Sequence, residues 1–98
     1  MSVKIAVIGA GSIGFTRKLM QDVLAVPELQ DTTFAFTDIS ERNLRMVTRL
    51  AERDIEANDL PAELISTTDR REALRDADYV INVVRIGGLE GFRSDVEI

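Results

Sequence analysis

The sequence predicts an α/β fold built around a parallel sheet. Short apolar segments alternate along the chain with segments whose apolar residues follow helical spacing, and such alternation is typical of strands joined by helical crossovers. The first segment, Val3–Ile8, is β-branched, almost continuously apolar and followed at once by Gly9. A run of that length is expected for a strand that is covered on both faces, as the strands of a parallel sheet are.

Three further segments have the length and character of strands: Thr33–Thr37, Glu63–Thr67 and Tyr79–Val84. Helices are expected in between. The first begins near Ser12 and stops before Pro27, whose ring cannot continue a helix. Ser40 is a suitable N-cap for a long second helix with one apolar stripe. The third helix is short, and Asp69 and Glu72 have the spacing of a capping box at its start.

Composition excludes several classes of chemistry. The 98 residues include no Cys and no His, which removes disulfides, cysteine nucleophiles and the commonest metal ligand and general base. The net charge of −5 argues against nucleic acid as a partner. The longest apolar run, Ile5–Ala10, is far shorter than the ~20 residues of a membrane span, and no secretory pattern is present. We therefore expect a cytoplasmic protein that binds neither nucleic acid nor a membrane.

The clearest chemical signal is the G-x-G-x-x-G sequence of residues 9–14, between the first strand and the first helix. In that context Gly9 permits a tight turn, Gly11 lets a pyrophosphate approach the backbone, and Gly14 allows the helix to pack closely on the strand. The free N–H groups of the first helical turn would bind the pyrophosphate. Ser12 either adds a hydroxyl to that site or caps the helix. No Gly-Lys-Ser/Thr follows, which excludes an ATPase P-loop.

An acid at the end of the second strand is the other part of a dinucleotide-binding fingerprint. Asp38 stands there, close to the usual ~20 residues after the glycines. A carboxylate at this place accepts hydrogen bonds from the adenosine ribose and repels a 2′-phosphate, which favours NAD over NADP. The alternative is that Asp38 caps the next helix and the glycines only permit a turn. Together these features predict a Rossmann-like, doubly wound sheet, truncated after about four strands.

The segment after the fourth strand contains Arg85, Gly87 and Gly88. Ligands of open α/β sheets bind at the carboxyl ends of the strands, so we expect this segment near the cofactor or the substrate. The alternative is an ordinary loop. Asn82, on the same strand, either reaches the cofactor or bonds to the backbone.

Four stretches together resemble one family: Lys4–Ser12, Phe36–Ile39, Glu72–Asn82 and Arg85–Gly88. They are similar to the family 4 glycoside hydrolases, the NAD- and manganese-dependent α-galactosidases and α-glucosidases, and the resemblance runs along essentially the whole chain. The first two stretches are shared with many dehydrogenases. The combination of Gly-Ala-Gly-Ser with the Asp-Ala-Asp…Asn block and Ile-Gly-Gly is more particular.

The resemblance implies a glycosidase that does not use paired carboxylates. Such enzymes oxidise the sugar at C3 with bound NAD, eliminate the glycosidic oxygen, add water and reduce C3 again, while Mn²⁺ polarises the sugar oxygens. A Cys and a His bind that metal, and a Tyr is the base, all beyond the N-terminal domain. We therefore interpret residues 1–98 as the NAD-binding portion of a larger enzyme, with no catalytic and no metal-binding residue, inactive alone and homo-oligomeric in its full-length form.

By the same resemblance, the cofactor-binding positions are Gly9, Gly11, Ser12, Ile13, Gly14, Asp38 and Arg85. Members that act on 6-phosphosugars place a phosphate-binding arginine shortly after this last position. It falls here on Phe92, with Arg93 one step away, which favours an unphosphorylated galactoside or glucoside as substrate.

Two alternatives remain open. The chain could be the N-terminal domain of a 2-hydroxy-acid dehydrogenase of the lactate and malate type, or a nucleotide-sensing module without chemistry of its own. A downstream Cys and His at metal-ligand positions would favour the glycosidase, and an Arg/His pair the dehydrogenase.

Overall fold

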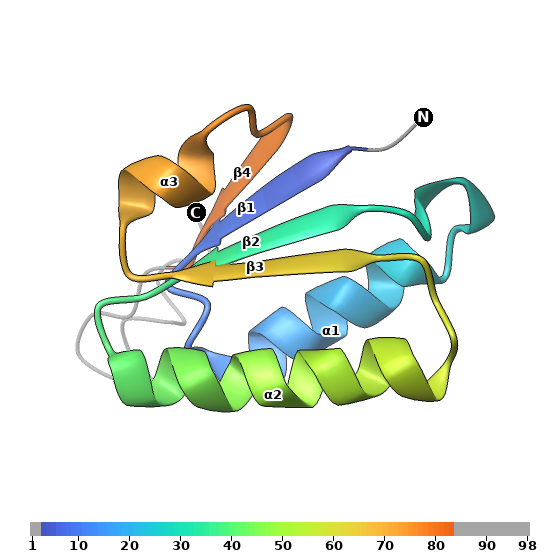
Figure 1. Ribbon diagram of the computed structural model, residues 1–98, viewed down its shortest axis with the longest axis horizontal. Coiled ribbons are helices and arrows are strands. Elements are labelled where there is room, and N and C mark those ends of the chain that lie inside the picture. Colours follow the sequence, from blue (N-terminus) through green and yellow to red (C-terminus); the bar gives the residue numbers. More distant parts are fainter. Residues whose placement is uncertain (1–2, 84–98) are drawn as a thin grey trace, which may run out of the picture.

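The computed structural model describes residues 3–83, which form one parallel sheet with helices on both faces (Figure 1). Its strands are β1 Lys4–Ile8, β2 Thr33–Thr37, β3 Glu63–Thr67 and β4 Tyr79–Asn82. They are ordered β3-β2-β1-β4, and every neighbouring pair is parallel. This order matches the first four of the six strands in the doubly wound pattern, whose strand order reverses direction beside β1. The predicted Rossmann-like fold is confirmed.

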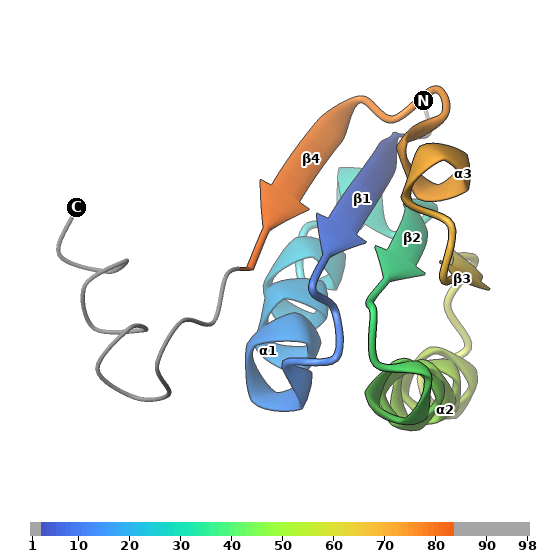
Figure 2. The same cartoon turned by 90° about the vertical axis from the view of Figure 1, so that its left-hand side faces the viewer.

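The helices divide between the two faces of the sheet, as Figure 2 shows. Helices α1 Ile13–Leu24 and α2 Glu41–Ala57 lie on one face, and the short α3 Arg70–Leu74 lies on the other. Pro27 begins a single 3₁₀ turn, η1 Pro27–Leu29, instead of continuing α1. Among residues 3–83, neither α1 nor any other helix has the length and apolar character needed to cross a membrane.

The two faces carry cores of different size. Side chains alternate between the faces along a strand, so Val7, Phe34 and Phe36 pack under α1 and α2, and all three are fully buried. The intervening Ala6 and Ala35 meet Ala73 of α3 on the other face. The large side chains therefore stabilise the α1–α2 face, and alanines let the backbone of α3 approach the sheet closely.

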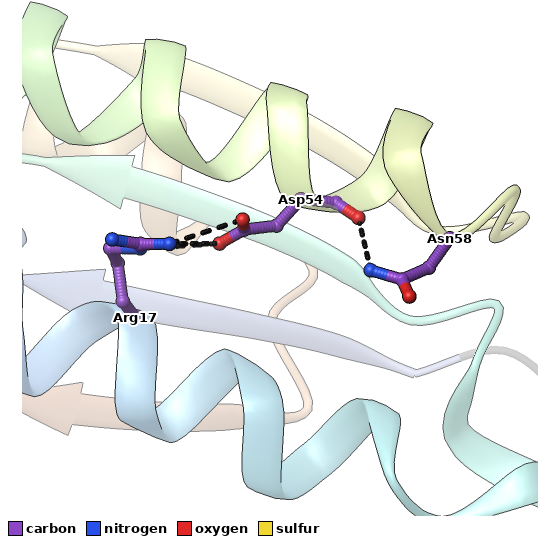
Figure 3. A network of polar contacts seen from close by, with 3 residues as sticks. All are labelled: Arg17, Asp54 and Asn58. Atoms are coloured by element: carbon purple, nitrogen blue, oxygen red, sulfur yellow. Dashed lines mark hydrogen bonds and ion pairs between the residues drawn. The ribbon is translucent and has the colours of Figure 1, made fainter.

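An ion pair joins the two helices of the larger face. The Arg17 guanidinium of α1 donates to both carboxylate oxygens of Asp54 on α2, at 3.1–3.2 Å (Figure 3). Asn58, at the end of α2, donates from its amide to the Asp54 carbonyl oxygen at 2.8 Å. Arg17 and Asp54 are each about one-third exposed, so solvent weakens this contact.

The expected elements and the observed ones agree closely, with differences at the caps. β2 and β3 have the predicted bounds, and Ser40 caps α2 by accepting from Asn43 N–H at 3.3 Å. Asp69 caps α3 by accepting from the N–H of Arg71. The predicted capping box is not closed, because the Asp69 N–H donates to the Thr67 hydroxyl instead of to Glu72. β1 begins at Lys4 and β4 ends at Asn82, so Val3 and Val83 lie outside the strands that were predicted to include them. Val84 lies outside the described residues.

Candidate functional site

A cleft of about 650 Å³ opens at the carboxyl edge of the sheet. Every strand contributes to it: Gly9 follows β1, Asp38 and Ile39 follow β2, Asp69 follows β3 and Val83 follows β4. Because the strands are parallel, their carboxyl ends meet at one edge, where open α/β sheets bind ligands. The cleft thus contains the first glycine of the predicted fingerprint and its acid.

The turn after β1 requires glycine at its first position. Gly9 has φ of +82°, which side chains disfavour, and a Cβ there would overlap the carbonyl oxygen of Val83. The N–H groups of Gly9 and Ala10 both donate to the Thr37 carbonyl oxygen, at 2.9 and 3.1 Å. The turn is therefore held against the end of β2 and beneath the end of β4.

Asp38 ties the glycine turn to the start of α2. Its Oδ2 accepts from the Gly11 N–H at 2.7 Å, and its Oδ1 accepts from the Ser40 N–H at 2.8 Å. A Cβ on Gly11 would lie 2.6 Å from Asp38 Oδ2 and 2.7 Å from the Asn43 Cβ. Gly11 was expected to leave room for a pyrophosphate, and the structure gives a further reason for glycine: the Asp38 carboxylate and Asn43 occupy the space beside it.

Gly14 differs from the expectation of close helix–strand packing. In the described part of the chain, nothing beyond its own helix backbone and chain neighbours lies within 4 Å of the position that a Gly14 Cβ would take. Ser12 is buried and its side chain makes no capping hydrogen bond, so the capping alternative for its hydroxyl is wrong. Ile13 begins α1, as predicted.

Two residues of the site were not predicted from the sequence to have a role in it. Thr16 is fully buried on α1, and its hydroxyl donates to the Ala10 carbonyl oxygen at 2.8 Å, which fixes the turn from the helix side. Ile39 is fully exposed at the cleft beside Asp38. The sequence offered one signal for each of these two residues: Thr16 is a polar residue on the buried stripe of α1, and Ile39 is an apolar residue just past the end of a strand.

The cleft carries charge of both signs. Asp38 and Asp69 supply carboxylates, and Arg70 and Arg71 of α3 supply guanidinium groups. The first turn of α1 contains no acid, so its partial positive charge stays available to an anion. Within residues 3–83, no three side chains of metal-ligating type come together.

The predicted cofactor-binding residue Arg85 lies outside the described residues, and so do Gly87, Gly88, Phe92 and Arg93.

Comparison with known proteins decides the family. The model of a family described as family 4 glycosyl hydrolase matches residues 4–98. The chain belongs to family 4 of the glycosyl hydrolases. An alpha-galactosidase of Rhizobium meliloti (strain 1021) is 57% identical over 97 residues, which cover 99% of this chain and 20% of that protein. An alpha-glucosidase of Erwinia rhapontici is 33% identical over 87 residues, which cover 89% of this chain and 19% of that protein.

A solved structure shares the fold. It is a 6-phospho-alpha-glucosidase from gut microorganisms in complex with NAD and glucose-6-phosphate, with a TM-score of 0.74 and 28% identity, covering 92% of this chain and 20% of that one. The chain therefore spans about a fifth of the length of the proteins it resembles. The family match favours the glycosidase over the dehydrogenase and sensing-module alternatives.

Proposed function

We propose that this chain is the NAD-binding portion of a family 4 α-galactosidase or α-glucosidase. The observation that carries the proposal is Asp38, whose carboxylate lines the cleft while it joins the glycine turn to α2. The complex of a structural relative with NAD and the 57% identity to an alpha-galactosidase support it.

The residues present fit a dinucleotide. Each Asp38 oxygen accepts one backbone hydrogen bond and keeps acceptor capacity for one ribose hydroxyl. The open space at Gly14 and the acid-free start of α1 leave room and positive potential for a pyrophosphate. Ile39 offers an exposed apolar surface that suits an adenine ring. In this arrangement the chain binds and orients the cofactor, and Asp38 repels a 2′-phosphate.

Bound NAD would supply hydride acceptance and return at C3 of the sugar. The side chains that hold Mn²⁺ and move the C2 proton belong, in this proposal, to the portion of the relatives that the chain does not cover. The substrate proposed is an unphosphorylated galactoside or glucoside, in line with the alpha-galactosidase and alpha-glucosidase among the relatives. Arg85 is proposed to approach the nicotinamide and the sugar.

A titration with NADH tests the cofactor site directly. The chain contains no Trp, so nicotinamide fluorescence can be followed without interference, after circular dichroism has shown that the chain is folded. We expect saturable binding that Asp38→Ala weakens roughly ten- to a hundredfold, since a hydrogen bond to a charged group contributes about 1.5–3 kcal/mol.

Asp22→Ala is the matched control, because Asp22 is an exposed acid on α1 away from the cleft. It removes the same charge and should leave the affinity unchanged. Equal losses of NADH affinity in both variants would mean that net charge alone causes the effect. A folded chain without saturable binding would overturn the proposal.

A further inference from the structure

Among residues 3–83, β3 is an edge strand that pairs with β2 alone. The N–H of Glu63 donates to the Thr32 carbonyl oxygen at 3.1 Å, so the backbone groups of Glu63 face β2. Successive residues of a strand turn these groups to opposite sides. The N–H and C=O groups of Leu64 and Ser66 therefore face away from the sheet, where they offer donors and acceptors to another strand.

A groove beside this edge contains two arginines in one half, whereas the charged residues of its other half are all acids. Helix α2 runs beneath β3 in the opposite direction (Figure 1). Near the carboxyl end of β3 the groove is lined by Arg45 and Arg49, with Glu41 and Glu52 on either side of them. Near the amino end of β3 it is lined by Glu52, Glu56 and Asp59. The midpoint is marked by the hydrogen bond between the hydroxyls of Thr48 and Ser66, at 3.0 Å.

We propose that β3 and α2 form a symmetric interface with a second copy of this chain. A two-fold axis at Ile65, normal to the sheet, makes the two β3 strands antiparallel neighbours. Leu64 of one copy then lies opposite Ser66 of the other, and each of these pairs exchanges two backbone hydrogen bonds. The outward-facing groups of β3 are satisfied by their own copies, and Ile65 packs against Ile65 across the axis.

The same axis aligns opposite charges. It reverses α2, so the basic half of one helix lies beside the acidic half of the other. The hydrogen bond from Thr48 to Ser66 places Thr48 one strand residue away from the axis at Ile65. A strand rises ~3.3 Å per residue and a helix ~1.5 Å, so the axis crosses α2 about two residues beyond Thr48, near Leu50 and Ala51. Reversal about that point places Arg49 opposite Glu52 and Arg45 opposite Glu56, each twice by symmetry. Glu41 and Asp59 meet at the rim, where solvent screens their repulsion. This self-complementarity identifies the occupant as a second copy.

The opposite edge of the described sheet provides the competing explanation of any self-association. β4 exposes Tyr79 and Val80 by 62% and 52%, and the doubly wound pattern adds its next strand at this edge. Association through β4 would depend on these apolar side chains and not on the charges of α2.

Two charge variants distinguish the edges. Arg45→Glu with Arg49→Glu makes the groove wholly acidic, and Glu52→Arg with Glu56→Arg makes it basic apart from the rim acids. Sedimentation velocity over a wide range of concentration should show the unmodified chain as a dimer and each variant alone with a dissociation constant raised on the order of tenfold or more, since each lost pair becomes a like-charge pair. An equimolar mixture should form a heterodimer, because each basic position then faces an acid.

The strand contact has its own pair of variants. Ser66→Pro removes an outward N–H that β2 does not use, which an edge strand tolerates, and it should weaken the dimer. Ser66→Ala is the matched control, since it removes the hydroxyl bond to Thr48 and keeps the N–H. Circular dichroism establishes whether each variant is folded. If Ser66→Pro does not fold, the charge variants alone test the proposed interface. The proposal would be overturned if the unmodified chain were a monomer, or if the charge variants left the dissociation constant of the dimer unchanged. Either result would hold whatever the NADH titration shows.

Discussion

The central strands and the edge strands of the sheet differ in burial. Phe34 and Phe36 of β2 are completely buried, whereas Tyr79 and Val80 of β4 are more than half exposed. The glycine turn and Asp38 follow the central strands β1 and β2. The cleft with its glycine turn and Asp38 is therefore anchored to the best-packed part of the described residues, and the edges of the described sheet are where further sheet or another copy can add contacts.

The largest expected effect tests this difference in burial. Phe34→Ala should destabilise the fold by about 3–5 kcal/mol, because it removes a fully buried ring and leaves a cavity. Val80→Ala, on the exposed edge, should cost less than ~1 kcal/mol. Urea unfolding followed by circular dichroism measures both. Similar losses would mean that β4 carries as much of the core as β2 does.

Gly9→Ala should have the next largest effect on stability. It places a side chain at φ of +82° and against the Val83 carbonyl oxygen, and strain with displacement of backbone costs on the order of 2–4 kcal/mol. The same unfolding measurement applies, and NADH affinity should fall as well. A stable Gly9→Ala variant with unchanged affinity would show that the turn can move without consequence.

The proposed function assigns the choice between NAD and NADP to the carboxylate of Asp38. We expect the unmodified chain to bind NAD⁺ more tightly than NADP⁺, and Asp38→Asn to narrow the ratio by on the order of tenfold, since the amide keeps the shape but not the charge that repels a 2′-phosphate. Isothermal titration with both cofactors gives the ratio. If the ratio of the two affinities did not change, Asp38 would not be the residue that contacts the ribose.

Gly14→Ala is the matched opposite of Gly9→Ala. Gly14 lies in α1, and no described neighbour stands where its Cβ would be, so alanine should stabilise the fold by about 0.5–1 kcal/mol through helix propensity. If a pyrophosphate uses this open space, the more stable variant should bind NADH more weakly. Denaturation midpoints and the fluorescence titration separate the two effects.

The ion pair between α1 and α2 should contribute least. Arg17→Lys keeps the charge but loses the two-pronged contact with Asp54, and a partly exposed pair is worth ~1 kcal/mol or less. A double-mutant cycle with Asp54→Asn measures the coupling. A coupling well above that value would mean that the pair holds the two helices in place.

Much of the fold follows from local signals. The β-branched run before Gly9, the strand at Thr33–Thr37 and the Ser40 cap each act within a few residues, so the sequence alone predicts them. The capping box at Asp69 failed because Thr67, at the end of the preceding strand, competes for the Asp69 N–H. Such a competitor is set by the geometry of the strand end, which residue spacing does not specify.

The candidate site was predicted less completely, because its bonds join distant segments. The motif places Gly11 and Asp38 in one fingerprint, but only the fold shows that the carboxylate itself occupies the space beside Gly11. In the same way, the Thr16 hydroxyl meets the Ala10 carbonyl through the path of the turn. Sequence periodicity assigns a residue to a face and does not identify its partner.

Ile39 gives the cleft a thermodynamic signature. This side chain is fully exposed in the folded chain, so water that orders around it is retained on folding. A planar ring that covers it releases that water, and burial of apolar surface lowers the heat capacity of the complex. Cofactor association should therefore become more exothermic as temperature rises, and Ile39→Ser should flatten that slope.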